Sequence, residues 1–153
     1  MKIYNYSLLK HMVSILCFLL LVSASNSVFA ELATQGVRNK IVIQVSTDDP
    51  RTQTIALNNA VNLQKMYGMD NIAIEIVAYG PGLGLVTQES KQALRVKSLA
   101  MQNIRFSACG NTMDKIAKKT GHRPKALDGV QEVKAGVSRI MELQQQGYAY
   151  VRP

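Results

Sequence analysis

The stretch that decides the fold runs over residues 104–113 and reads Ile104-Arg105-Phe106-Ser107-Ala108-Cys109-Gly110-Asn111-Thr112-Met113. Apolar and polar side chains alternate over its first half, which is the period of a β-strand. Gly110 then allows the chain to turn, and Asn111 and Thr112 are favoured N-cap residues for a helix that we expect over residues 113–120. The pattern therefore predicts that Cys109 lies where a strand ends and a helix begins.

This position favours the charged form of Cys109. The first turn of a helix carries unpaired N–H groups and the positive end of the helix dipole, and both stabilise a thiolate. Thiolates at helix N-termini can have pKa values of roughly 3.5–7.5. We therefore predict that Cys109 is the catalytic residue, and that Gly110, Asn111 and Thr112 bind an anion beside it. The alternative is a buried, inert thiol that packs as a small apolar residue.

The chain has 153 residues and opens with the pattern of a signal peptide. Lys2 and Lys10 precede an apolar run over residues 12–22, and small residues then lead to Val28-Phe29-Ala30. The apolar run is too short for a comfortable membrane span, although an uncleaved anchor is the alternative. We expect cleavage after Ala30, export to the periplasm, and no stable membrane insertion of the mature chain.

Cleavage would leave residues 31–153, which suit a single domain. It would remove Cys17, so that Cys109 becomes the only cysteine and no intramolecular disulfide can form. An unpaired cysteine in an oxidising compartment is buried, paired between chains or reactive. Loss of two lysines would lower the net charge from +8 to +6. The basic residues show no aromatic interleaving, so we expect no nucleic-acid partner.

The mature chain alternates five predicted strands with helices. We expect strands over residues 40–46, 72–79, 104–108, 129–133 and 148–151. We expect helices over residues 50–67, 86–101, 113–120 and 136–146. This alternation predicts an α/β fold, a three-layer α/β/α sandwich with a five-stranded, mostly parallel sheet.

Three loops should meet at the carboxyl edge of that sheet, where ligands bind in such folds. They contain Thr47 and Asp48, the glycines of residues 80–84, and Cys109. Gly80 and Gly82 are predicted binding residues because glycine lets a backbone approach a ligand closely. Their spacing is not the dinucleotide fingerprint, and we expect no cofactor.

Two further ionisable residues have simpler explanations. Glu75 is the one charged residue of the second predicted strand. A structural ion pair with Arg105 of the next strand, or a position at an oligomer face, explains it better than catalysis. His122 has no second ligand nearby in the sequence, so we expect a solvated loop residue and no metal site. Assistance of Cys109 by either residue stays open.

The order of motifs resembles that of the DsrE/DsrF-like proteins. The resemblance covers nearly all of the mature chain and rests on residues 40–45, 74–83, 106–113, 135–137 and 143–150. It implies a three-layer fold with a five-stranded parallel sheet and a tendency to form homo-oligomers. Cytoplasmic members carry sulfur as a cysteine persulfide, and Cys109 matches the position of their active cysteine. The signal peptide and the lack of a second, resolving cysteine set this chain apart from them.

Two functions follow as hypotheses. The first is an exported sulfur carrier or sulfurtransferase, in which Cys109 takes sulfur from a donor and passes it to an acceptor thiol of a protein or small molecule. The second is a non-catalytic, oligomeric module that binds a small ligand or a partner, with Cys109 only lining the pocket.

Overall fold

The structure is a computed structural model that describes residues 39–153, so the predicted signal peptide lies outside the described residues. The strands are β1 (Asn39–Val45), β2 (Ile72–Ala78), β3 (Ile104–Cys109), β4 (Val130–Val133) and β5 (Ala149–Val151). The helices are α2 (Pro50–Tyr67), α3 (Ala93–Ala100), α4 (Gly110–Thr120) and α5 (Gly136–Gln145), with a 3₁₀ helix, η1 (Gly80–Val86), after β2.

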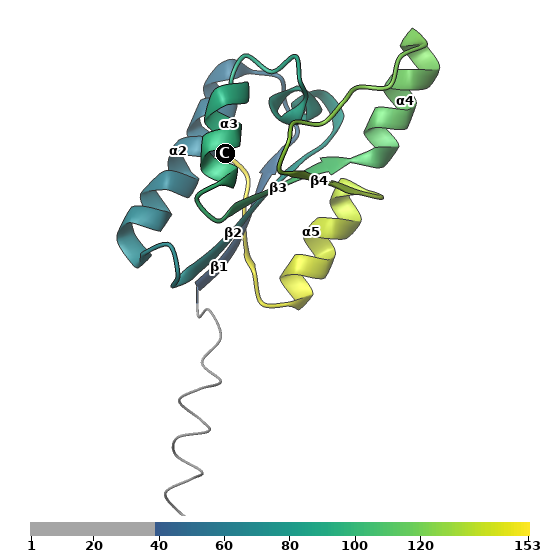
Figure 1. Cartoon of the computed structure of the whole chain (residues 1–153). Helices are drawn as coiled ribbons and strands as arrows, with labels where there is room; N and C mark the ends of the chain where they lie inside the picture. Colours follow the sequence, from purple (N-terminus) through teal and green to yellow (C-terminus); the bar gives the residue numbers. More distant parts are fainter. Residues whose placement is uncertain (1–38) are drawn as a thin grey trace, which may run out of the picture. The chain divides into compact units, whose positions relative to one another are not determined.

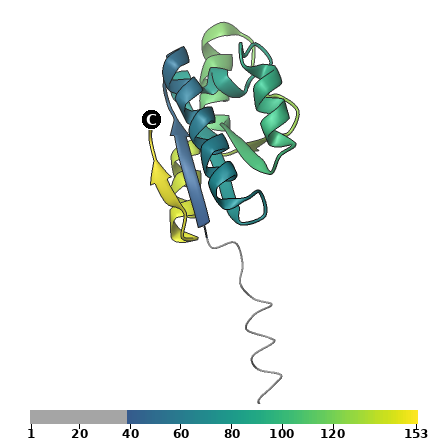
Figure 2. The same cartoon turned by 90° about the vertical axis from the view of Figure 1, so that its left-hand side faces the viewer.

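The five strands form one sheet in the order β4-β3-β2-β1-β5, and each pair of neighbours is parallel. Figures 1 and 2 show α2 and α3 on one face of this sheet and α5 on the other. The predicted three-layer α/β/α sandwich with a five-stranded parallel sheet is therefore confirmed.

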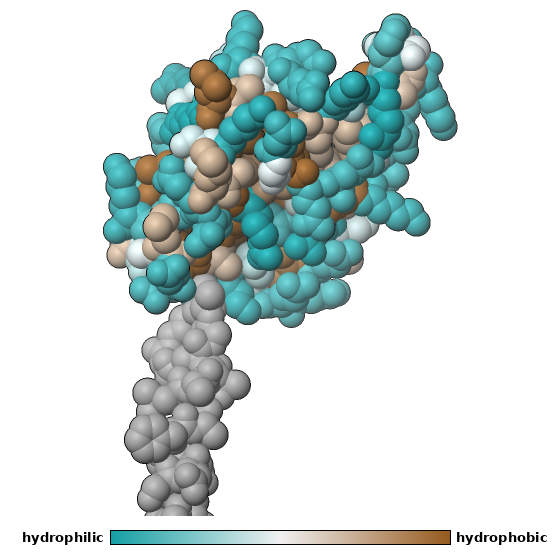
Figure 3. Space-filling view, viewed as in Figure 1, coloured by the Kyte–Doolittle hydropathy of each residue, from teal (hydrophilic) through white to brown (hydrophobic). Residues whose placement is uncertain are grey.

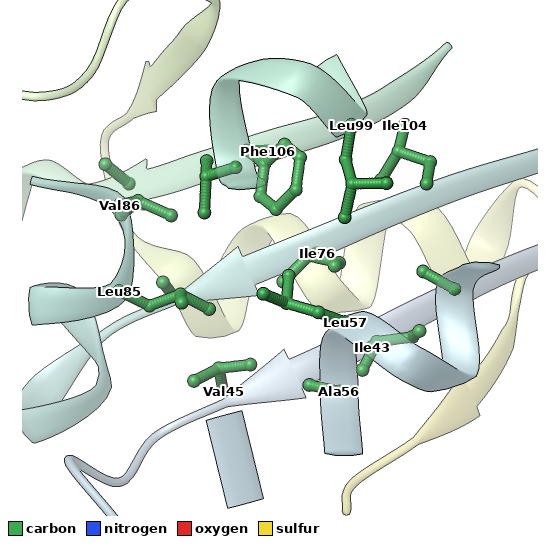
Figure 4. Close-up of a cluster of buried hydrophobic side chains, with 14 of the residues drawn as sticks. Ile43, Val45, Ala56, Leu57, Ile76, Leu85, Val86, Leu99, Ile104 and Phe106 are labelled. Atoms are coloured by element: carbon green, nitrogen blue, oxygen red, sulfur yellow. The ribbon is translucent and has the colours of Figure 1, made fainter. Parts of the chain in front are cut away.

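The larger core lies between the sheet and α2 and α3. Alternate side chains of the strands, such as Ile43, Ile76 and Phe106, point to this face and are almost fully buried (Figure 4). Leu57 of α2 packs against them. Burial of each such side chain contributes about 1.5–3 kcal/mol before the entropic cost of folding, so this face holds most of the apolar stabilisation.

Helix α2 begins and ends where the sequence predicts. The carboxylate of Asp49 accepts a hydrogen bond from the Thr52 N–H at 2.7 Å, and Pro50 occupies the first turn. Gly68 follows the last turn with φ of 86°, a conformation that favours glycine.

The helix predicted over residues 86–101 is too long. Residues 80–86 form η1, and α3 starts only at Ala93. Between them, Thr87 pairs with Ala126 in an antiparallel bridge, and the Leu127 N–H donates to the Val86 carbonyl at 2.9 Å. This pairing holds the chain extended, so no helix can form there.

Helix α4 begins earlier than predicted. Its first residue is Gly110, and Cys109 itself, with extended φ and ψ of −76° and 111°, occupies the N-cap position expected for Asn111 or Thr112. The N–H of Asn111 donates to the Lys134 carbonyl at 3.1 Å, and this contact from the β4–α5 segment sets the start of the helix. The shift brings the cysteine closer to the helix N–H groups.

On the face drawn in Figure 3, hydrophobic side chains form small patches separated by hydrophilic ones. Within residues 39–153, no helix combines the length and the apolar composition that a membrane crossing requires.

Candidate functional site

The sheet has a topological switch between β3 and β4. Helix α4, which follows β3, places Met113 in the larger core, whereas α5, which follows β4, places Ile140 and Leu143 in the smaller core on the other face. The two helices therefore leave neighbouring strands towards opposite faces. In open α/β sheets such a point forms a ligand-binding crevice at the carboxyl ends of the strands. Cys109 is the last residue of β3 and lies at this point.

The thiol of Cys109 is enclosed by backbone from two helices. Cys109 pairs in register with Val133 of β4, and the residue as a whole is 5% exposed. The Thr112 hydroxyl and the N–H groups of Asn111 and Thr112 approach the sulfur from α4, and the Gly136 N–H approaches it from the first turn of α5. Two helix N-termini thus point at one sulfur atom.

These groups decide the ionisation of the thiol. Burial raises the pKa of Cys109, but the Thr112 hydroxyl and the N–H groups of Gly136, Thr112 and Asn111 outweigh burial, so the pKa lies below its ordinary value. The Cys109 side chain itself makes no capping hydrogen bond to α4. Charged hydrogen bonds are roughly twice as strong as neutral ones, so the surroundings favour the thiolate selectively.

Thr112 joins the predicted glycine loop to the site. Its Oγ1 accepts a hydrogen bond from the Gly80 N–H at 3.0 Å. The hydroxyl proton is then free to point towards the sulfur. Gly80 has φ of 54°, in the left-handed region that favours glycine. Gly80 therefore supports the site through Thr112.

The other predicted glycines serve close packing. A Cβ at Gly82 would lie 2.3 Å from the Val45 carbonyl oxygen, so η1 packs directly on the end of β1. A Cβ at Gly110 would lie 3.0 Å from Glu132 Oε1 and 3.2 Å from the Val133 carbonyl oxygen. Gly110 thus permits the close approach of β4 to the cysteine, whereas Gly82 contacts the β1 backbone.

Glu75 lies in a buried ion-pair network, and the predicted contact with Arg105 is present at 3.4 Å. Its stronger partner is Arg139 of α5, which contacts both carboxylate oxygens, and the Ser107 hydroxyl also donates to it at 2.7 Å. Burial raises the pKa of Glu75, but the hydrogen bonds from Arg139 and Ser107 and the charges of Arg139 and Arg105 outweigh it, so the pKa lies below its usual range.

Gly136 and Arg139 are site residues that the sequence analysis missed. Each lies more than twenty positions from Cys109 in the chain, and although residues 135–137 contribute to the family resemblance, no local pattern predicts that they approach the cysteine. The weak apolar character of β4, whose middle two residues are exposed, also concealed that this strand would border the cysteine.

His122 lies in the exposed loop after α4, and its N–H donates to Thr120 Oγ1 at 3.3 Å. Cys109 and His122 flank opposite ends of α4, as the sequence predicts. Among residues 39–153, no group of three or more His, Cys, Asp or Glu side chains could hold a metal ion.

A cavity of about 540 Å³ lies beside the switch point, between the end of β4 and α5. Polar residues line most of it, namely Asn111, Gln131, Glu132, Lys134, Ser138, Arg139 and Glu142. A larger hollow of about 760 Å³ includes Ile72, Ile104 and Tyr148 among its lining residues. These residues lie at the amino ends of the strands, so that hollow is separate from the thiol site.

No protein-family model and no curated protein matches the chain. A solved structure does match: a protein of unknown function, MTH1491, from Methanobacterium thermoautotrophicum. The two chains are 30% identical, with a TM-score of 0.68, and the match covers 75% of this chain and 99% of the other. This chain therefore belongs to the same family as the MTH1491 protein.

Proposed function

We propose that the protein is a sulfur carrier that holds one sulfur atom as a persulfide on Cys109. The observation that supports the proposal best is the convergence of the Thr112 hydroxyl and the Gly136 N–H on a sulfur whose pKa lies below its ordinary value. A thiolate is the nucleophile in sulfur exchange, and the resemblance to DsrE/DsrF-like proteins favours the same chemistry.

Loading would be a displacement at sulfur. The Cys109 thiolate attacks the outer sulfur of a persulfide or polysulfide donor, and a bond forms between Sγ and that sulfur. The donor's S–S bond breaks, and its electron pair leaves with the remaining donor sulfur as a thiolate. In delivery, an acceptor thiolate attacks the same outer sulfur and Cys109 leaves as a thiolate. A low thiol pKa makes Cys109 a good leaving group in this second step.

The burial of Cys109 restricts the donor. At 5% exposure the residue admits small reagents more readily than bulky ones. Inorganic polysulfide therefore suits the site better than a large folded donor whose thiol cannot reach the sulfur.

Mass spectrometry after incubation with inorganic polysulfide tests the proposal. Wild-type protein should gain the mass of a sulfur atom, a reducing agent should remove it, and Cys109→Ser should gain nothing. Thr120→Ser is a matched surface control that should load like the wild type. A wild-type protein that forms no adduct over the whole neutral pH range would contradict the sulfur-carrier function.

The cavity beside α5 supports the second function, a binding module without turnover. Its lining carries two cationic side chains, Lys134 and Arg139, and two carboxylates, Glu132 and Glu142, and this mixed charge suits a small polar ligand. A ligand that raises the melting temperature equally in wild-type protein and in Cys109→Ser would favour the binding function.

We further propose that the mature protein acts after export, as a homo-oligomer. Sequencing the N-terminus of protein recovered from the periplasm should give Glu31 as the first residue. Sedimentation of that protein measures the oligomeric state.

A further inference from the structure

A buried ion pair connects α5 to the centre of the sheet. The carboxylate of Glu75 in β2 is 0% exposed and accepts hydrogen bonds from Arg139 Nε at 2.7 Å and Nη2 at 2.8 Å. Arg139 lies three residues after Gly136, in the first turn of α5, and its backbone N–H donates to the Ala135 carbonyl. Such a two-point contact fixes the orientation of a side chain as well as its position.

Stability alone explains this ion pair poorly. The remainder of β2 is apolar, and burying two charges costs free energy that their attraction often only balances. A pair of apolar side chains of similar volume is frequently as stable or more stable. The buried pair therefore points to a geometric role.

Glu75 contacts both parts of the thiol site. Ser107, which donates to Glu75 at 2.7 Å, lies two positions before Cys109 on β3, so both side chains are on the same face of the sheet. Arg139 lies on the helix that supplies Gly136. One carboxylate thus links the strand that carries the sulfur to the helix that carries the N–H group.

The first residue of α5 needs a close approach to the sheet. A Cβ at Gly136 would lie 3.0 Å from both Cβ and Cδ1 of Tyr79, which follows β2. Glycine lets the helix start press against this ring. Hydrogen bonds weaken steeply as their geometry departs from the optimum, so a small outward movement of α5 would remove the Gly136 N–H from the sulfur.

We propose that Glu75 is a positioning residue: through Arg139 it holds the first turn of α5 where the Gly136 N–H reaches the Cys109 sulfur. The inference rests on the proposed thiolate function of Cys109.

For Glu75→Gln, electrostatics and positioning predict shifts of the thiol pKa in opposite directions. Besides Arg139, the charged groups at this network are Arg105, 3.4 Å from Glu75 and bonded to the Tyr148 hydroxyl, and Glu142, 3.4 Å from Arg139. Removal of the negative charge of Glu75 would, by relief of Coulomb repulsion alone, make a nearby thiolate more favourable and lower the thiol pKa. Loss of the Gly136 N–H would raise that pKa.

The test measures the thiol pKa from the pH dependence of iodoacetamide alkylation in the full mature chain. Glu75→Gln and Arg139→Gln should each raise it by about one unit, which is a tenfold loss of thiolate at a pH below the pKa. Arg105→Gln is the matched control: it also removes one positive charge from the same carboxylate but contacts no part of α5, so it should change the pKa far less.

A second measurement follows the Gly136 amide by NMR. Its chemical shift should titrate with Cys109 in the wild type and lose this titration in Glu75→Gln. If the buried variants do not fold, Arg139→Lys offers a milder change, because lysine keeps the positive charge but cannot make the two-point contact with Glu75. Arg139→Lys should raise the thiol pKa, and its control Glu142→Gln should not.

A folded Glu75→Gln whose thiol pKa equals or falls below that of the wild type would overturn the positioning role. Equal shifts in Arg139→Gln and Arg105→Gln, or in Arg139→Lys and Glu142→Gln, would overturn it as well. A wild-type thiol with an ordinary pKa would instead contradict the proposed function, so the two failures are distinguishable.

Discussion

At the scale of the residue, Thr112 illustrates how one side chain can serve two loops. Its hydroxyl oxygen accepts a hydrogen bond from the Gly80 N–H, which leaves its hydroxyl proton free to point towards Cys109. A hydroxyl can do both because it has one donor and two acceptor lone pairs. The glycine loop therefore acts on the thiol through Thr112.

Thr112→Val should raise the pKa of Cys109 by about one unit, because a hydrogen bond to the charged form is lost while the side-chain shape stays nearly the same. The rate of alkylation as a function of pH measures this pKa. Thr112→Ser keeps the hydroxyl and should leave the pKa close to the wild-type value. Equal pKa values in the Val and Ser variants would show that the hydroxyl does not stabilise the thiolate.

Single residues also show which features of the site the sequence alone predicts. Alternation around Phe106 and the glycine after Cys109 were enough to place the cysteine at a strand end beside a helix start. The prediction that Asn111 or Thr112 is the N-cap residue was wrong, because a long-range contact of Asn111 with Lys134 sets the start of the helix. Local patterns carry no information about such a contact.

At the scale of the element, α5 and β2 are joined by a carboxylate whose ionisation should affect stability. The pKa of Glu75 in the folded protein lies below its usual range, because Arg139, Ser107 and Arg105 outweigh the effect of burial. A lowered pKa means that the unfolded chain binds the proton more tightly than the folded chain does.

The contribution of Glu75 should therefore be fully present above the unfolded pKa of about 4.3 and be lost as the pH falls through the lower folded pKa. Near neutral pH, Glu75→Gln should lower the free energy of unfolding by about 3–5 kcal/mol, because it leaves Arg139 without its buried partner. Urea unfolding of wild type and variant from neutral to acidic pH measures the difference, which should shrink towards low pH. A constant difference would contradict the sign of the Glu75 pKa shift.

Elements differ in how well the sequence predicted them. Strands β1 and β2 are apolar runs buried on both faces, and they were located to within a residue at each end. The start of α3 was not, because the bridge between Thr87 and Ala126 overrides the helical pattern of residues 86–92. The approach of α5 to Cys109 depends on an ion pair across 64 positions of sequence, which no periodicity reveals.

At the scale of the whole molecule, the two faces of the sheet carry cores of unequal size. Leu57 lies in the larger core under α2, and Leu143 lies in the smaller core under α5, and both are 0% exposed. Each core packs against the same strands, so unfolding of either face should remove support from the other.

Leu57→Ala and Leu143→Ala should each lower the free energy of unfolding by about 2–5 kcal/mol, the usual effect of a buried cavity. Circular dichroism and tyrosine fluorescence should report coincident transitions in both variants. Leu94→Ala, at a residue that is 87% exposed, is the control and should change stability by about 0.5 kcal/mol or less. An early, separate transition in Leu143→Ala alone would show that α5 unfolds independently.

The strand order has a consequence for how the chain is made. β1 lies between β2 and β5, and β5 ends only two residues before the end of the chain. During synthesis on the ribosome, one edge of β1 stays without its neighbour until β5 has emerged. The sheet of residues 39–153 can therefore be completed only after nearly all of them have been made.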